Sequence, residues 1–229
     1  MSGFKELIKT FHISKSEDTL TAMSKIPELL SRNQGHDENI NIRFVDDVLL
    51  PEGMLISDIQ DAVRRAQQYT GFEYAQDVYM YNIVYSKGRR VGGLAARIYP
   101  KKSEFFVKIL LSISEAKLQA EKKTESGFCP GNAGEQLWAI AFEEAIHAAR
   151  MVQGKFDHHG YYKLPKSASH VEYEKYLSQP EEQYVEDALN SGILKAKFGE
   201  NVIYHKKRVL HLQSVCPPPC PDRKIFNQV

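Results

Sequence analysis

Two glutamates and one histidine lie close together in an apolar segment, at Glu143, Glu144 and His147. If the segment is helical, the three side chains fall within one arc of about 100° on the helix surface. Their neighbours are mostly apolar, which predicts a helix that is buried on most sides. Buried carboxylates are costly unless they have partners, so a metal ion or a catalytic role would explain them. The alternative is an ordinary pair of residues i and i+4 on a helix face open to water.

In residues 142–150 the sequence reads FEEAIHAAR, and Gly154 follows shortly after. This run resembles the active helix of zincin metallopeptidases. It is similar in particular to bacterial effector peptidases, whose helix reads His-Glu-hydrophobic-hydrophobic-His-Ala-x-Arg and reaches a glycine soon after. The resemblance covers about residues 105–190, with strands before the helix and a Glu-rich helix after it. It implies a zincin-like fold and a metallopeptidase-like activity on a protein substrate, as in a bacterial effector or toxin.

The resemblance also implies a role for each residue of the motif. Glu144 would be the general base that takes a proton from the attacking water, and His147 would be the second metal ligand. Ligands at positions i and i+4 share one face of a helix, within reach of the base beside them. The third ligand of the family lies on a later helix, where the candidates are Glu181, Glu182 and Glu186.

The first ligand position departs from the family, because Glu143 stands where zincins have histidine. A carboxylate can bind zinc, so Glu143 could be a hard ligand. A ligand set rich in oxygen suits manganese, iron or magnesium better than the zinc of a typical peptidase. Two functions therefore stay open. One is a metal-dependent hydrolase with an altered site for zinc or another divalent metal, and the other is a pseudoenzyme that binds a protein partner on the same scaffold.

The pattern of apolar residues predicts the elements that position this motif. Strands are expected at residues 40–50, 77–85, 91–99, 105–113 and 202–212, and helices at 57–69, 135–153 and 178–190. The three central strands read as a meander whose last two strands form a hairpin, and the polar residues 115–126 are expected to be mobile. The fold class is thus α+β, with a small mixed or antiparallel sheet and helices packed on it. The resemblance makes it zincin-like around Glu143 and His147.

Length and composition indicate a single domain of 229 residues. Within it we expect a helical N-terminal segment at 1–40, a zincin-like core at 77–190 and a tail rich in proline and cysteine at 213–229. Lys and Arg number 30 and Asp and Glu number 29, so the overall charge does not favour nucleic acid, and basic turns near 87–90 and 101–102 are expected to be solvated. No segment is apolar enough for a membrane helix or a secretory signal, which predicts a cytoplasmic protein; export without a signal peptide stays open.

The three cysteines, Cys129, Cys216 and Cys220, form a second set of candidate residues. Three thiolates and a histidine could hold zinc, as in a zinc-dependent nucleic-acid deaminase. The spacing of Cys216 and Cys220, and the lack of a ligand at the start of the 135–153 helix, count against that function. A thiol nucleophile at Cys129 with His147 as its base lacks a third group to orient it. The low, odd count predicts three free thiols.

Overall fold

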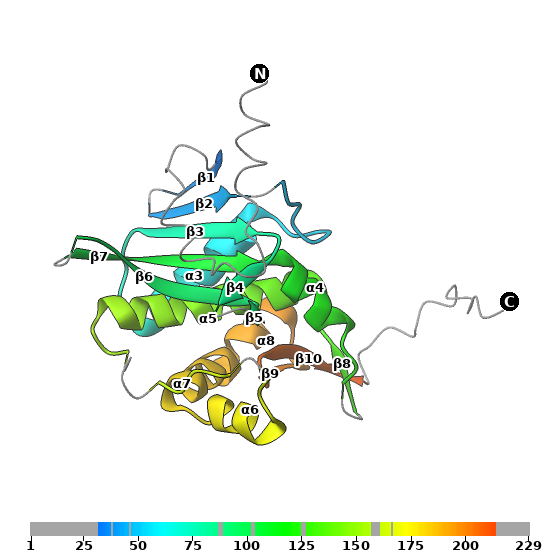
Figure 1. The fold of residues 1–229 in the computed structure, drawn as a ribbon. Helices are drawn as coiled ribbons and strands as arrows, with labels where there is room; N and C mark the ends of the chain where they lie inside the picture. Colours follow the sequence, from blue (N-terminus) through cyan, green and yellow to red (C-terminus); the bar gives the residue numbers. More distant parts are fainter. Residues whose placement is uncertain are drawn as a thin grey trace, which may run out of the picture.

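The computed structural model describes residues 32–213 except 38, 46, 87–88, 102–103, 125–126, 157–160 and 166. Of the segment expected to be helical at 1–40, residues 1–31 lie outside the described residues and residues 32–37 form a strand instead; of the tail expected at 213–229, only residue 213 is described. Figure 1 shows a twisted sheet, a long helix below it, and a smaller layer of helices and short strands beneath that helix. The predicted α+β class is confirmed. Within the described part, no helix is long and apolar enough to cross a membrane.

A five-stranded mixed sheet forms the upper layer. Its strands, in spatial order, are β1 (Arg32–Asp37), β2 (Ile40–Phe44), β3 (Gln76–Tyr81), β7 (Glu104–Ser112) and β6 (Gly93–Lys101). The three central strands are parallel to one another, and each outer strand is antiparallel to its neighbour. β6 lies at one edge, and among the described residues no strand pairs with its outer side. This open edge is the part of the sheet that borders the candidate site.

The strands expected at 91–99 and 105–113 form the antiparallel hairpin β6–β7, as predicted. The expected meander is wrong, because β3 pairs in parallel with β7 and not with β6. The chain first makes a small separate hairpin, β4 (Val84–Ser86) with β5 (Arg89–Val91), and so leaves the place beside β3 to the later strand. The sheet also includes β1 and β2, which precede the expected 77–190 core.

Two helices pack on the sheet and on each other. α3 (Ile56–Thr70) connects β2 to β3, and α5 (Ala133–Val152) lies below β6 and β7. α5 begins with a capping box, in which Asn132 and Glu135 each accept a hydrogen bond from the other's backbone amide. It ends before Gly154, whose φ of 70° favours glycine. Nearly every residue of α5 is buried, as its apolar composition predicts.

The rest of the chain packs around α5. It comprises α4 (Ile113–Glu121), β8 (Phe128–Pro130), α6 (His170–Leu177), α7 (Pro180–Ala188), the kinked turn η2 (Leu189–Ile193), α8 (Leu194–Phe198), β9 (Val202–His205) and β10 (Arg208–Leu212). β8, β10 and β9 form a small antiparallel sheet. Part of the segment expected to be mobile is the helix α4, because Ser112 caps it and Ala116 is buried. The strand expected at 202–212 is a hairpin that turns at Lys206 and Lys207.

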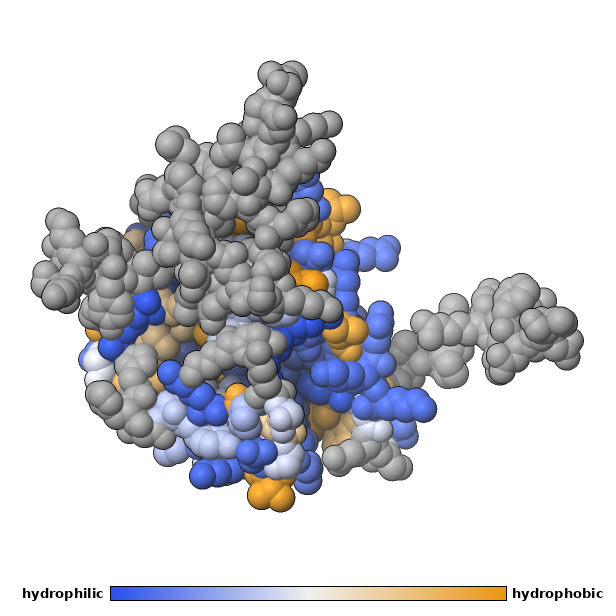
Figure 2. All heavy atoms as spheres, in the orientation of Figure 1, coloured by the Kyte–Doolittle hydropathy of each residue, from blue (hydrophilic) through white to orange (hydrophobic). Residues whose placement is uncertain are grey.

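The surface is of mixed character. On the face shown in Figure 2, hydrophobic residues are scattered among hydrophilic ones, which is typical of a surface in contact with water. The outer face of the sheet carries a second, small cluster of buried side chains, made of Tyr79, Tyr81, Val84 and Leu110. The main core lies between the sheet, α3 and α5.

Candidate metal centre

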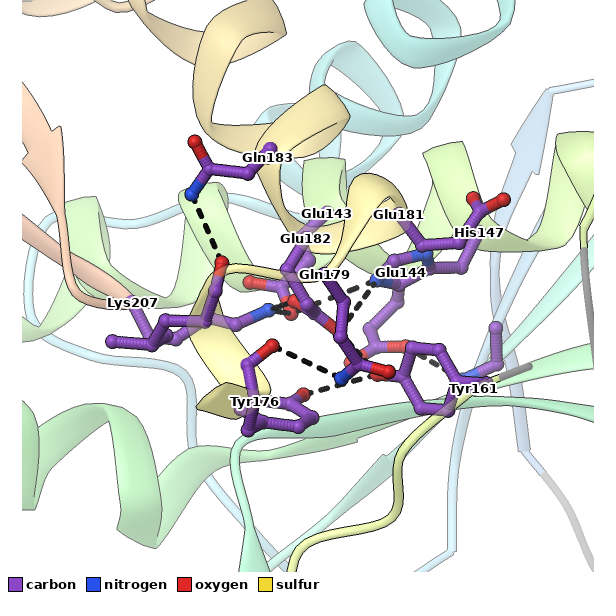
Figure 3. Close-up of polar contacts among 12 residues, drawn as sticks. Glu143, Glu144, His147, Tyr161, Tyr176, Gln179, Glu181, Glu182, Gln183 and Lys207 are labelled. Atoms are coloured by element: carbon purple, nitrogen blue, oxygen red, sulfur yellow. Dashed lines mark hydrogen bonds and ion pairs between the residues drawn. The ribbon is translucent and has the colours of Figure 1, made fainter. Parts of the chain in front are cut away.

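Three buried side chains from two helices converge on one point between α5 and α7. Glu143 and His147 lie one turn apart on α5, and Glu182 reaches them from the first turn of α7 (Figure 3). One nitrogen of His147 and one oxygen of each carboxylate lie within 4.8 Å of one another. None of the three residues is more than 7% exposed. We name Glu143, His147 and Glu182 the Glu-His-Glu cluster.

The imidazole of His147 faces both carboxylates without bonding to either. Its Nε2 lies 4.0 Å from Oε1 of Glu143 and 3.8 Å from Oε1 of Glu182, which is longer than a hydrogen bond. Its Nδ1 is buried and has no hydrogen-bond partner among the described residues. Burial, and then the charge of Lys207, lowers the pKa of His147 to about 4, so the ring is neutral at pH 7.

Tyrosine hydroxyls hold both carboxylates of the cluster. Tyr204 on β9 donates a hydrogen bond of 2.6 Å to Oε2 of Glu143. Tyr161 donates to Oε1 of Glu182, and its oxygen lies 3.2 Å from the hydroxyl of Tyr176. Burial raises the pKa of each of these hydroxyls, so all three stay protonated and able to donate. Partners of this kind orient the carboxylate ligands of metal sites.

A lysine ammonium lies between the two carboxylates. Nζ of Lys207 donates to Oε1 of Glu143 at 2.5 Å and also to Oε2 of Glu182 (Figure 3). Burial opposes the ionisation of Glu143, but the charge of Lys207, His147 and the hydrogen bond from Tyr204 together lower the pKa of that carboxyl. One positive group beside the cluster therefore already offsets part of the negative charge of its two acids.

The turn that carries Lys207 is strained. Lys206 and Lys207 form the two-residue turn between β9 and β10, with φ of 48° and 65°. Residues with a side chain adopt this left-handed conformation at a cost of about 1–2 kcal/mol each, and hairpin turns that require it usually contain Asn and Gly. Backbone strain of this kind is often found at functional sites.

Glu144 is adjacent to the cluster in the chain but contacts the sheet. Its Oε2 accepts a hydrogen bond of 2.6 Å from the backbone amide of Ala95 on β6. Burial, and then the negative charge of Glu143, raises the pKa of Glu144 to about 8. β6 approaches this closely because residue 93 is glycine. A Cβ on Gly93 would lie 2.5 Å from Cγ of Glu144 and 2.9 Å from Cγ2 of Ile140.

The cluster opens into a cleft of about 1250 Å³ along the edge of β6. Glu143, Glu144 and His147 of α5 line it, together with residues 91–97 from the start of β6 and the turn before it. Tyr161 and Lys207 line it as well. A ligand in this cleft would therefore contact the strand edge and the candidate site at the same time.

The later helix of the sequence prediction is α7, and it supplies one of its three candidate acids to the cluster. Glu182 completes the cluster, as described above. Glu181 instead forms two hydrogen bonds with the guanidinium of Arg150, at 2.7 and 3.0 Å. Glu186 lies one turn further along, with its Oε1 3.2 Å from Nδ1 of His205. The structure thus does not bring Glu181 or Glu186 to the candidate metal centre.

Four residues of the site were not identified from the sequence. They are Gly93, Tyr161, Tyr204 and Lys207. One local signal exists for Lys207, since two consecutive lysines interrupt the alternation of residues 202–212. For the other three, the sequence offers no local signal.

The cysteines do not join this site. Cys129 lies on β8 and is disulfide-bonded. The expectation of three free thiols is therefore wrong, and Cys129 is not a free nucleophile for His147. Its partner lies outside the described residues, as do Cys216 and Cys220.

Comparison with known proteins does not assign this chain to a family. No protein-family model, no curated protein and no solved structure matches the chain. The function is therefore argued from the site itself.

Proposed function

We propose that this protein is a metal-dependent hydrolase that cleaves peptide bonds, with Glu143, His147 and Glu182 as its metal ligands. The observation that carries this proposal is the convergence of three ligand atoms within 4.8 Å, buried at the base of a cleft. Two ligands one turn apart on a helix, joined by an acid from a later helix, also agree with the resemblance to zincins. Glu144 is the proposed general base.

The cluster fits a divalent cation. Metal–ligand bonds of about 2.0–2.2 Å place the ligand atoms of a tetrahedral ion about 3.3–3.6 Å apart. The distances of 3.8 and 4.0 Å from Nε2 of His147 exceed this only slightly. Without a cation, Nε2 is too far from both carboxylates for a hydrogen bond, and Nδ1 also has no partner within the described part. One imidazole and two carboxylates suit zinc, manganese or iron.

A divalent cation held here would polarise the scissile carbonyl and make a water molecule more acidic. The chain's own residues would supply the remaining steps. In its ionised form, Glu144 would take a proton from the attacking water and transfer it to the leaving nitrogen. The amide of Ala95 positions the Glu144 carboxyl at the edge of β6, where an extended polypeptide could pair with the strand.

One observation favours a second function, that of a binding module without metal. The ammonium of Lys207 contacts both Glu143 and Glu182. Buried carboxylates with such a partner are stable without a metal ion. The cleft would then bind a polypeptide without cleaving it. Lys207 and a metal ion would compete for the same two carboxylates.

The two functions differ in the metal that the purified protein binds. The protein is stripped with a chelator and reloaded with zinc, manganese or ferrous iron, and bound metal is measured by mass spectrometry and titration calorimetry. The hydrolase should bind one equivalent, and His147→Ala or Glu182→Gln should weaken this binding strongly. Glu186→Gln is the matched control, because Glu186 contacts His205 and not the cluster. A wild-type protein that binds no metal would contradict the hydrolase and favour the binding module.

A further inference from the structure

The rim of the cleft is rich in basic side chains, although the whole chain has a formal net charge of only +1. Apart from the cluster, Glu144 and Lys207, the charged side chains among the described residues that line the cleft are one acid, Glu115, and six bases: Arg89, Arg90, Arg97, Lys122, Lys155 and Lys163. We name the six bases the basic rim. Glu115 lies 3.7 Å from both Arg90 and Lys122, so it offsets only part of the positive charge.

The basic rim has two parts, which flank the contact between Glu144 and β6. Before β6, Arg89 donates a hydrogen bond of 2.7 Å to the carbonyl of Pro165, which brings the segment that carries Lys163 next to β5. Further along β6, Arg97 donates a hydrogen bond of 3.0 Å to the carbonyl of Met151, near the end of α5. Lys155 follows α5 a few residues later. A ligand that follows β6 would therefore meet positive charge on both sides of Glu144.

The edge of β6 is suited to an extended polypeptide. The amide of Ala95 points away from β7, because it donates to Glu144. Since alternate residues of a strand are equivalent, the backbone polar groups of Gly93 and Arg97 point the same way. Among the described strands, none pairs with this edge. Such an edge can accept another extended chain through backbone hydrogen bonds on either side of Ala95, whose own amide donates to Glu144.

We infer that the ligand of this cleft is an extended polypeptide segment rich in aspartate and glutamate. The inference rests on the proposed function, since it names the substrate class of the same site. The backbone of the ligand would pair with β6, and its carboxylates would pair with the basic rim on either side of Glu144. A polypeptide suits the cleft better than a nucleic acid does, because strand pairing requires a peptide backbone.

Peptide binding to the complete chain tests this inference. The probes are three fluorescent nine-residue peptides, the length of β6, in which Thr alternates with Glu, Gln or Lys. Fluorescence polarisation is measured in a chelator, so that the result does not depend on a metal. The Glu peptide should bind about 10-fold more tightly than the Gln peptide at low salt, as a few exposed ion pairs would produce. This preference should decrease at about 1 M salt, which screens exposed charges.

Substitutions in the basic rim test whether its lysines cause the preference for the Glu peptide. Lys155→Gln combined with Lys163→Gln should reduce the preference for the Glu peptide severalfold. The matched control is Lys117→Gln combined with Lys195→Gln, which removes two exposed lysines that do not line the cleft. This control should keep the full preference.

Three results would overturn the inference. The first is equal affinity for the three peptides, and the second is an equal loss of preference in the control variant. The third is an affinity for a single-stranded DNA oligonucleotide as high as that for the Glu peptide. The basic rim would then recognise any polyanion. None of these results bears on whether the Glu-His-Glu cluster holds a metal, which the metal titration decides separately.

Discussion

Glu143 and Glu144 are adjacent in the chain, yet their surroundings favour opposite protonation states. Successive residues of a helix point about 100° apart, so Glu143 faces α7 and the β9–β10 hairpin while Glu144 faces the sheet edge. Lys207 lowers the pKa of Glu143 against the effect of burial. Burial and the charge of Glu143 raise the pKa of Glu144. At the scale of single residues, the partners therefore distinguish two chemically identical side chains.

Lys207→Met should strengthen metal binding. The substitution removes the ammonium that occupies Glu143 and Glu182, and we expect the dissociation constant to fall about 10-fold or more, which is about 1.4 kcal/mol. The stripped variant should also be less stable, because two buried carboxylates lose their positive partner. Titration calorimetry measures the first effect and thermal unfolding the second.

The control for this experiment is Lys206→Met. Lys206 belongs to the same strained turn, but its Nζ lies 3.1 Å from Glu174 and it does not reach the cluster. Its substitution should leave metal affinity unchanged. If Lys207→Met binds metal no better than this control, the ammonium and the metal do not compete.

Glu144→Gln should remove turnover and keep the metal. Glutamine has nearly the same shape and can still accept the hydrogen bond from Ala95, but it cannot act as a base. Loss of a general base typically lowers kcat about 10²–10⁴-fold. Fragment release from a Glu-rich peptide measures turnover, and calorimetry measures metal affinity. A variant that cleaves as fast as the wild type would show that Glu144 is not the base.

At the scale of elements, the site depends on how closely β6 lies to α5. Gly93 permits this contact because it has no side chain, and the close approach allows the amide of Ala95 to donate a hydrogen bond to Glu144. The other elements contribute through their ends: the first turn of α7 carries Glu182, and the turn of the β9–β10 hairpin carries Lys207. Small shifts of these ends would change the distances within the cluster without changing the fold.

Gly93→Ala should destabilise the protein and displace Glu144. The added methyl group would lie within 3 Å of both Glu144 and Ile140, and overpacking of this kind costs about 1–3 kcal/mol. Chemical denaturation measures the loss. Gly92→Ala is the matched control, because its closest neighbour would be Cδ1 at the flexible end of Ile140, at 3.0 Å. If the two variants are equally stable, the contact between β6 and α5 is not tight.

The sheet contains an ion pair whose contribution should depend on pH. Asp77 on β3 pairs across the sheet with Lys108 on β7. Burial opposes the ionisation of Asp77, but Lys108, together with Asn41 and Arg43, lowers the pKa of Asp77 below its usual value. A carboxyl whose pKa is lowered on folding stabilises the protein above its unfolded-state pKa of about 3.9, and this stabilisation is lost as the pH falls through the lower folded-state pKa.

Asp77→Asn should therefore cost about 1–2 kcal/mol at pH 7. The difference from the wild type should become smaller below about pH 4. Urea unfolding across this pH range measures the difference in stability between the variant and the wild type. Asp47→Asn, at an exposed position, is the control. A difference that does not change with pH would show that the pair does not titrate in this range.

At the scale of the whole molecule, α5 lies between the five-stranded sheet and the layer that contains α7 (Figure 1). The Glu-His-Glu cluster joins α5 to the layer that contains α7. A bound metal would add bonds between α5 and α7 that are absent from the unfolded chain. Metal binding should therefore stabilise the entire fold.

The melting temperature of the wild-type protein should rise with metal concentration. At a free metal concentration about 100 times the dissociation constant, the added stability is about 2.7 kcal/mol. His147→Ala should show no such rise, because the cluster loses its nitrogen ligand. Thermal unfolding in a series of metal concentrations measures the effect. A wild-type melting temperature that does not change with metal concentration would contradict the proposed hydrolase.

The sequence by itself predicts α5 and the candidate residues that it carries. The boundaries of this helix depend on Asn132, Glu135 and Gly154, and the shared face of Glu143 and His147 depends on helical periodicity. These are interactions within one or two turns, so the local pattern contains the necessary information. The β6–β7 hairpin is predicted for the same reason.

Only the tertiary structure decides which distant residues complete the site. Three acids of the later helix are equivalent in the sequence, and packing of α7 on α5 selects Glu182. The contact of Glu144 with Ala95 joins residues 49 positions apart, and that of Glu143 with Lys207 joins residues 64 positions apart. Such contacts depend on how the sheet edge, α7 and the hairpin pack around α5. Local propensity does not encode that packing, because it arises from the burial of many apolar side chains at once.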